Sequence, residues 1–222
     1  MLACLYSGGK DSTLALHKMA EQGKPAELLI SSVSLNDFSY MFHKPNIEFT
    51  KMQAEAMGIR QVFFTTKGEK ETELTDLENA LRENGVTELI TGAVASTYQK
   101  SRIEKLCGAL NITHYGPLWG IDPLTELNEL SANFNVIITQ VAAEGFGREF
   151  LGSRIDSSMI ERLIKLKERH GINMLFEGGE AESFVLDAPL FSKRIEILKA
   201  RTEMSGSMGK YVIEEARFAE KV

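Results

Sequence analysis

Six consecutive residues, Ser7-Gly8-Gly9-Lys10-Asp11-Ser12, form the most concentrated group of potentially reactive or ligand-binding residue types in the sequence. They follow an apolar run at residues 1–5 that predicts a strand, and they precede a stretch with helical spacing. A strand, a glycine turn and a helix amino terminus direct several backbone N–H groups and the helix dipole toward one point, which favours an anion. The glycines let a polyphosphate approach the backbone closely, because neither carries a Cβ. Lys10 adds a positive charge and the two serines add hydroxyl donors, so the pattern predicts a polyphosphate site.

The spacing separates this 7–12 loop from two other phosphate loops. The sequence has neither the G-x-x-x-x-G-K-[ST] spacing of a Walker A loop nor the G-x-G-x-x-G of a dinucleotide fingerprint. The six residues instead resemble, without a gap, the pyrophosphate loop of the N-type ATP pyrophosphatases, the PP-loop superfamily. That resemblance implies cleavage of ATP between its α and β phosphates, usually to adenylate an acceptor. An ordinary strand-to-helix turn with solvated polar side chains is the alternative.

A second polar constellation lies far along the chain, at Glu177-Gly178-Gly179-Glu180, with Glu182 two residues later. The glycine turn is expected to bring Glu177 and Glu180 to one face. Paired carboxylates there would bind a cationic group or act as a general base, because each raises the proton affinity of the other. The alternative is a tight turn with solvated glutamates.

The elements that must position these residues alternate regularly in the first half. Apolar, β-branched runs predict strands at residues 1–5, 26–35, 61–65 and 88–93, and apolar residues at helical spacing predict helices at 14–22, 47–57, 69–84 and 96–110. This alternation predicts an α/β fold with a doubly wound parallel sheet, Rossmann-like, which would bind its ligand at the carboxyl edge of the strands.

Several candidate nucleotide contacts fall at that edge. Ser34 ends the second predicted strand, and His43 lies in the following loop, where it would contact a nucleotide or simply face water. Gly92 and Ala93 end the fourth predicted strand. Their small size would let a base or ribose pack against the backbone, although close packing of a helix on a strand explains them equally well.

The predicted helix 96–110 begins with polar residues. Ser96 is expected to cap it, with Gln99 three residues later as in a capping box, so Gln99 has a structural explanation as well as a role toward substrate. Tyr98 lies on the same early turns. Arg102 is a candidate for stabilising charge on a departing pyrophosphate.

The second half changes character. A helix is predicted at residues 122–133, a strand at 136–141, a helix at Ser157–His170, and a β-hairpin from 194–202 and 210–218 around a turn at 205–209. We therefore predict a nucleotide-binding domain at residues 1–130 and a smaller substrate-binding α+β domain at residues 131–222.

Composition limits the partners. The net charge is −6 and no run of Lys or Arg reaches five residues, which disfavours stable binding to nucleic acid. Cys4 and Cys107 form no CxxC pair, so buried free thiols in a reducing compartment are expected. No signal peptide and no apolar run of 18 residues is visible, which predicts a cytoplasmic protein without a membrane span.

Taken together, these stretches resemble the diphthine–ammonia ligase family within the PP-loop superfamily. The resemblance covers nearly the whole chain and rests on the 7–12 loop, Ser39-Tyr40-Met41-Phe42-His43, Gly68-Glu69-Lys70-Glu71, Gly92-Ala93 with Tyr98-Gln99 and Arg102, Leu118-Trp119-Gly120, Leu151-Gly152, the 177–180 turn, and Val185-Leu186-Asp187-Ala188-Pro189. Ala181 and Ser183 depart from the family pattern, which usually has an aromatic residue and a threonine there. The chain is similar to the short archaeal form.

The resemblance implies an ATP-dependent ligase that adenylates the carboxylate of diphthine on elongation factor 2 and amidates it with ammonia, with Mg²⁺ bridging the phosphates near Asp11. Lys10 and Arg102 would then stabilise phosphate charge, and Glu177 and Glu180 would hold the cationic substrate or ammonia. The remaining implied substrate contacts are Tyr98, Gln99, Gly178, Gly179 and Glu182. A homo-oligomer is possible. A tRNA-modifying PP-loop enzyme and a non-catalytic module that binds ATP or AMP are the alternatives.

Overall fold

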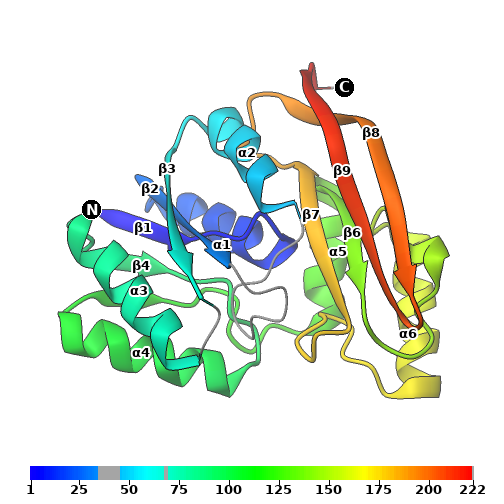
Figure 1. Ribbon diagram of the computed structural model, residues 1–222, viewed down its shortest axis with the longest axis horizontal. Coiled ribbons are helices and arrows are strands. Elements are labelled where there is room, and N and C mark those ends of the chain that lie inside the picture. Colours follow the sequence, from blue (N-terminus) through cyan, green and yellow to red (C-terminus); the bar gives the residue numbers. More distant parts are fainter. Residues whose placement is uncertain (35–45, 68–69, 222) are drawn as a thin grey trace. The chain divides into compact units, whose positions relative to one another are not determined.

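The computed structural model of the protein describes residues 1–34, 46–67 and 70–221 (Figure 1). The chain divides into two compact units. The first consists of Met1–Ser7 with Asp11–Trp119, and the second of Gly8–Lys10 with Gly120–Val222. Three residues of the 7–12 loop therefore belong, by their contacts, with the second half of the sequence.

The first unit is built on a five-stranded parallel sheet in the order β3-β2-β1-β4-β5. The strands are β1 (Leu2–Leu5), β2 (Leu28–Ser34), β3 (Arg60–Thr66), β4 (Glu88–Ile90) and β5 (Thr113–Tyr115). The helices are α1 (Lys10–Glu21), α2 (Thr50–Met57), α3 (Lys70–Glu83) and α4 (Thr97–Leu110), with a short 3₁₀ turn, η1 (Ile47–Phe49), before α2. This arrangement confirms the predicted doubly wound α/β sheet.

Apolar side chains of α3 and α4 cover one face of this sheet. Leu77, Leu81, Ile103 and Cys107 pack there with the buried residues of β1, β2 and β4. Both cysteines are free and buried, as predicted. Burial raises the pKa of the Cys107 thiol to about 11, so it stays protonated and packs as a small apolar group.

The strand order reverses between the central strand β1 and its neighbour β4. In a doubly wound fold the loops at the carboxyl ends of these two strands diverge to opposite faces and leave a crevice for ligand. The loop after β1 is the 7–12 loop, and the loop after β4 contains Gly92 and Ala93. Two of the predicted segments therefore follow the two strands at which ligands of this fold bind.

The second unit carries an antiparallel sheet in the order β7-β6-β9-β8. Its elements are α5 (Pro123–Asn133), β6 (Asn135–Val141), the 3₁₀ turn η2 (Arg148–Phe150), α6 (Ser157–His170), β7 (Ala181–Asp187), β8 (Arg194–Ser205) and β9 (Met208–Ala219). The predicted hairpin is confirmed, but its turn is tighter than expected and has Gly206 in the left-handed region at φ 61°. Within the described residues, no helix has the length and apolarity to cross a membrane.

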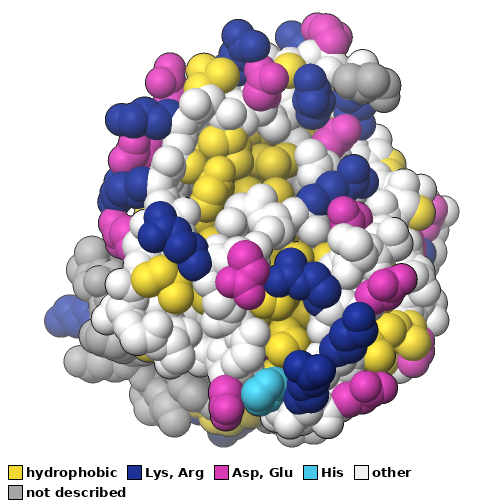
Figure 2. Space-filling view, turned by 90° about the vertical axis from the view of Figure 1, so that its right-hand side faces the viewer, with side chains coloured by type: hydrophobic (Ala, Val, Ile, Leu, Met, Phe, Trp, Pro, Cys, Tyr) yellow, Lys and Arg dark blue, Asp and Glu magenta, His cyan; other side chains and the backbone are white. Residues whose placement is uncertain are grey.

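Charged side chains of both signs alternate on the hairpin. Lys199 and Arg201 each lie 2.8 Å from a carboxylate oxygen of Glu214, and Arg217 lies 2.6 Å from Glu196. Figure 2 shows the same mixture on one face of the molecule, where Lys and Arg are interspersed with Asp and Glu around apolar side chains.

The start of α6 offers a test of local stability. Asp156 caps this helix by accepting hydrogen bonds from Met159 N at 2.9 Å and from Ser158 Oγ at 2.8 Å. These bonds, the backbone one first, hold the pKa of the Asp156 carboxyl below its usual value. Since the folded-state pKa is lowered, the cap is fully effective above the unfolded-state pKa and is lost as the pH falls through the folded-state pKa.

We expect Asp156→Ala to lower the free energy of unfolding by about 1 kcal/mol at pH 7, because the helix loses its N-cap. Urea denaturation followed by circular dichroism measures the loss. Asp156→Asn is the control, since asparagine caps a helix without a charge and should retain most of the stability. A cost of Asp156→Ala that does not shrink at acidic pH would show that the charged cap is not the cause.

Candidate functional site: the 7–12 loop and its partners

Helix α1 begins at Lys10, one turn earlier than the predicted start at residue 14. The prediction was wrong because the apolar spacing starts only in the second turn, whereas the first turn is polar. Gly8 has a positive φ of 76°, which lets the chain turn sharply from the strand into the helix. Lys10, Asp11 and Ser12 therefore lie in the first helical turn, where backbone N–H groups have no partner within the helix and where the positive end of the helix dipole is found.

Hydrogen bonds to β2 hold the entrance to this loop. Tyr6 N donates to Ile30 O at 2.8 Å, and Ser31 Oγ donates to Tyr6 O at 2.7 Å. The Tyr6 hydroxyl lies 3.2 Å from Thr13 Oγ1, so the same residue also contacts the second turn of α1. The backbone that leads into the loop is thus held by β2, and the Tyr6 side chain links it to α1.

The two serines of the loop lie together. Ser7 N donates to Ser12 Oγ at 3.3 Å, and the two hydroxyl oxygens are 3.2 Å apart. Asp11 is half-buried in the first turn, where the helix dipole favours its negative charge. Among the described residues, no group of three or more His, Cys, Asp or Glu side chains is placed to hold a metal ion. Asp11 therefore offers a carboxylate beside the loop but not a protein-built metal cage.

Gly92 brings the loop after β4 into backbone contact with α1. A Cβ added at Gly92 would lie 2.6 Å from the Asp11 carbonyl carbon and 2.7 Å from Ser12 N. β4 itself ends at Ile90, so Gly92 and Ala93 follow the strand instead of ending it as predicted. The contact leaves the amino terminus of α1 and this loop at van der Waals distance, at the point where the strand order reverses.

We expect Gly92→Ala to destabilise the protein by about 1–3 kcal/mol, the usual cost of inserting a methyl group into a filled space. The added carbon meets backbone, which cannot move aside as a flexible side chain can. Urea denaturation gives the change. Gly108→Ala in α4 is the matched control, because nothing lies within 4 Å of its added Cβ and alanine favours a helix; it should be neutral or stabilising. Equal effects of the two variants would contradict the contact.

Helix α4 places three predicted residues on its first turns. Ser96 caps the helix by accepting a hydrogen bond from Gln99 N at 3.4 Å, as the capping-box pattern predicted. The Arg102 guanidinium lies 5.2 Å from the centroid of the Tyr98 ring, one turn away along the helix. The ring orients the planar cation, and both side chains are half-buried. A cation and a hydroxyl-bearing aromatic therefore form one group on α4.

In the second unit, strand β7 holds the Gly8–Lys10 part of the loop. Val185 N donates to Gly8 O at 3.0 Å, and Lys10 N donates to Ser183 Oγ at 3.1 Å. Sequence reasoning did not predict β7 as a strand. Ser183, noted only as a departure from the family pattern, is thus a direct partner of the loop.

The Lys10 side chain is buried in an ion pair. Its Nζ lies 3.1 Å from Glu126 Oε1, with relative exposures of 1% and 0% for the two side chains. The same Nζ is 5.7 Å from the centroid of the Phe176 ring. Sequence reasoning missed Glu126 because it lies in the predicted helix 122–133. Glu126 lies on the same buried face of α5 as Leu130, and a carboxylate on an apolar helix face would have indicated a special role.

The 177–180 turn is closed by one of its own glutamates. Glu180 accepts hydrogen bonds from Asn173 N at 2.7 Å and from Gly178 N at 2.9 Å, one on each carboxylate oxygen. Gly179 has a positive φ of 81°. Glu177 is half-buried at the start of this turn, and Glu182 lies in β7 opposite Gln140. Glu180 therefore orders the backbone of the turn between Glu177 and Glu182.

For two predicted site residues the structure describes no side-chain position. His43 lies outside the described residues, and Ser34 is the last residue of β2, where only its backbone is described.

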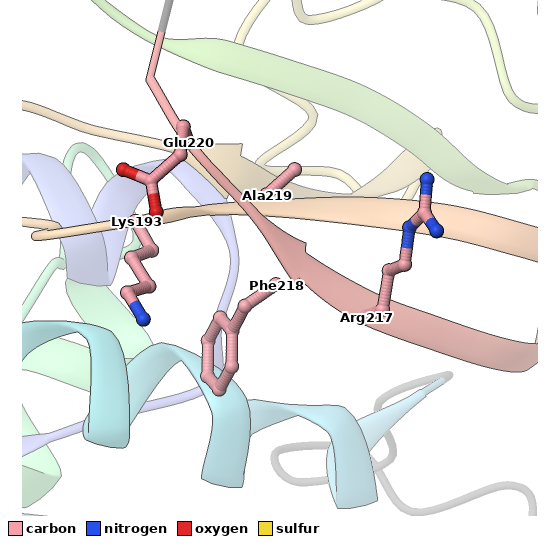
Figure 3. A pocket seen from close by; sticks show the side chains of 5 residues that line it. All are labelled: Lys193, Arg217, Phe218, Ala219 and Glu220. Carbon is pink, nitrogen blue, oxygen red and sulfur yellow. The ribbon is translucent and has the colours of Figure 1, made fainter.

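A separate pocket of about 310 Å³ lies in the second unit, lined by Lys193, Arg217, Phe218, Ala219 and Glu220. Figure 3 shows the Lys193 and Phe218 side chains extending in the same direction. None of these five was predicted as a site residue.

The buried pair leads to a prediction about stability. We expect Lys10→Met to lower the free energy of unfolding by about 3–5 kcal/mol, because the Glu126 carboxylate stays in the interior without its counter-charge. Lys10→Met/Glu126→Leu should recover most of the loss, since an apolar pair replaces both charges. Urea denaturation measures both variants. Lys199→Met is the control, because it breaks an exposed pair that water screens, and it should change stability little. A Lys10→Met cost as small as that of the control would contradict the burial of the pair.

Known proteins are similar to this chain over most of its length. The family model for the diphthamide synthase N-terminal domain matches residues 1–114, and the one for the diphthamide synthase C-terminal domain matches residues 122–218. The Homo sapiens protein named diphthine–ammonia ligase is 33% identical over 220 residues, which cover 87% of this chain and 81% of that protein. The Bos taurus protein of the same name is 32% identical over 220 residues, with the same coverage.

A solved structure also aligns with most of the chain. It is described as a predicted subunit of tRNA methyltransferase from Methanocaldococcus jannaschii. The alignment covers 84% of this chain and 96% of that one, at 20% identity and a TM-score of 0.48.

Proposed function

Because the chain belongs to the diphthamide synthase family, as its motifs predicted, we propose that it is an ATP-dependent ligase that converts diphthine on elongation factor 2 into diphthamide. The observation that carries this proposal is the 7–12 loop at the amino terminus of α1, beside the reversal of strand order. That place combines the positive end of the α1 dipole with two adjacent hydroxyls and a lysine for the phosphates of ATP.

The reaction has two steps. An oxygen of the diphthine carboxylate attacks the α-phosphorus of ATP, the bond between the α-phosphorus and the bridging oxygen breaks, and pyrophosphate leaves. Ammonia then attacks the carbonyl carbon of the acyl adenylate, the bond from that carbon to the AMP oxygen breaks, and the nitrogen loses a proton. The products are an amide, AMP and pyrophosphate, so no oxidant or reductant is needed.

Residues of the first unit would act on the nucleotide. The first turn of α1, with Ser7 and Ser12, would bind the phosphates, and Arg102 would stabilise charge that develops on pyrophosphate. Gly92 and Ala93 would lie against the nucleoside, with Ser34 and His43 as further contacts. Mg²⁺ would neutralise phosphate charge, held mainly by phosphate oxygens with Asp11 as the nearby protein carboxylate.

Residues of the second unit would act on the acceptor. Glu177 and Glu182 would attract the trimethylammonium group of diphthine or hold ammonia, on a turn that Glu180 orders through its two backbone hydrogen bonds. The backbone of Gly178 and Gly179 is a further proposed substrate contact of this unit, and Tyr98 and Gln99 of α4 are proposed contacts from the first unit. A net charge of −6 suits a basic patch on a cytoplasmic protein substrate.

We expect AMP, pyrophosphate and a labelled amide when the protein is incubated with ATP, Mg²⁺, ¹⁵N-ammonium and diphthine-bearing elongation factor 2. Chromatography of the nucleotides and mass spectrometry of the modified histidine peptide measure the products. The matched control is elongation factor 2 that carries an unmodified histidine, which should give no AMP. Formation of ADP, or AMP that does not depend on diphthine, would overturn the ligase proposal.

A further inference from the structure

We infer that Glu126 of α5 is a positioning residue for Lys10, fixing the point at which the loop lysine presents its charge to the ATP phosphates. The inference rests on the proposed use of the 7–12 loop for ATP. It begins with a contact that no motif indicated: Glu126 Oε1 accepts a hydrogen bond from Lys10 Nζ at 3.1 Å, with both side chains buried.

Stability alone does not account for two charges at this place. Moving an ammonium and a carboxylate out of water costs several kcal/mol for each ion, and their attraction repays this cost only when the geometry is good. An apolar pair of the same size is often at least as stable. A buried ion pair next to a phosphate-binding loop is therefore better explained by what the cation does than by its contribution to folding.

The contacts fix Lys10 at both ends. Its backbone N–H donates to Ser183 Oγ at 3.1 Å, and its ammonium donates to Glu126. The Phe176 ring lies 5.7 Å from the ammonium. A free lysine has a flexible four-carbon stem and loses rotamer entropy when it binds a ligand. Holding both ends before ATP arrives removes that cost from binding, which is the usual effect of preorganisation.

The Glu126 carboxylate fixes the ammonium of Lys10 in the interior beside the loop, with Nζ and Oε1 3.1 Å apart. Glu126 would thus contribute to ATP binding through Lys10, without a contact of its own to the nucleotide.

The test is a double-mutant cycle on nucleotide affinity. Isothermal titration calorimetry with α,β-methylene-ATP, which cannot be cleaved between the α and β phosphates, gives Kd for the wild type, Glu126→Gln, Lys10→Met and the double variant. We expect Glu126→Gln to raise Kd about tenfold, within the range measured for residues in direct contact. The double variant should bind no more weakly than Lys10→Met, because Glu126 acts only through the lysine.

Two further variants separate positioning from folding. Glu126→Asp keeps the carboxylate but retracts it by one methylene, so the protein should fold while Kd still rises severalfold. Glu161→Gln on α6 removes an exposed carboxylate of the same unit and should leave Kd unchanged. Circular dichroism establishes that each variant is folded at the temperature of the titration.

Each outcome decides the inference. An unchanged or lowered Kd for Glu126→Gln and Glu126→Asp would overturn it, as would a double variant whose loss is the product of the two single losses. If the cycle is non-additive but the wild type forms no diphthine-dependent AMP, the positioning role stands and the ligase proposal falls. A wild type that does not bind α,β-methylene-ATP overturns both.

Discussion

Backbone contacts at the start of α1 are the constraint on which the rest of the site depends. The backbone just before the loop is held against the parallel sheet, because Tyr6 N donates a hydrogen bond to Ile30 O. Gly92 brings a second loop against the first turn of α1. A helix amino terminus binds an anion only if its N–H groups stay in place and are not covered by side chains. The first condition is met here by the backbone itself, which β2 and the loop after β4 hold in place.

The buried charges have the opposite character, because they depend on side chains from distant parts of the sequence. Lys10 and Glu126 compensate each other in the interior, and neither would be tolerated there alone. Phe176, beside this pair, holds a positive φ of 68°, which is unfavourable for a bulky residue. Its ring packs edge-on against Phe146, at 6.1 Å between centroids, and this packing holds the strained residue in place. The second unit thus holds Lys10 by tertiary contacts, each of which would be energetically unfavourable without the others.

Much of the fold follows from local sequence patterns. The apolar runs of β1, β2 and β3 and the spacing in α3, α4 and α6 predict their elements closely, because each is buried along one face or stripe. β5 is short, and β7 has only the three buried apolar residues 184–186 after the polar Glu182 and Ser183; both form because neighbouring strands supply hydrogen bonds. The same distinction applies to the site. Glycines, serines and the capping residue Ser96 act locally and are visible in the sequence, whereas Glu126 acquires its meaning only when α5 packs beside Lys10.

The hydrogen bond between Lys10 and Ser183 joins residues 173 positions apart. A chain that folds during synthesis completes its early elements first, and contacts of such long range form last because their loop must be closed against chain entropy. The parallel sheet of the first unit has all its strands by Tyr115, yet the loop that begins at its central strand cannot take its final backbone partners until β7 has left the ribosome. The loop would then reach its final backbone contacts only near the end of translation.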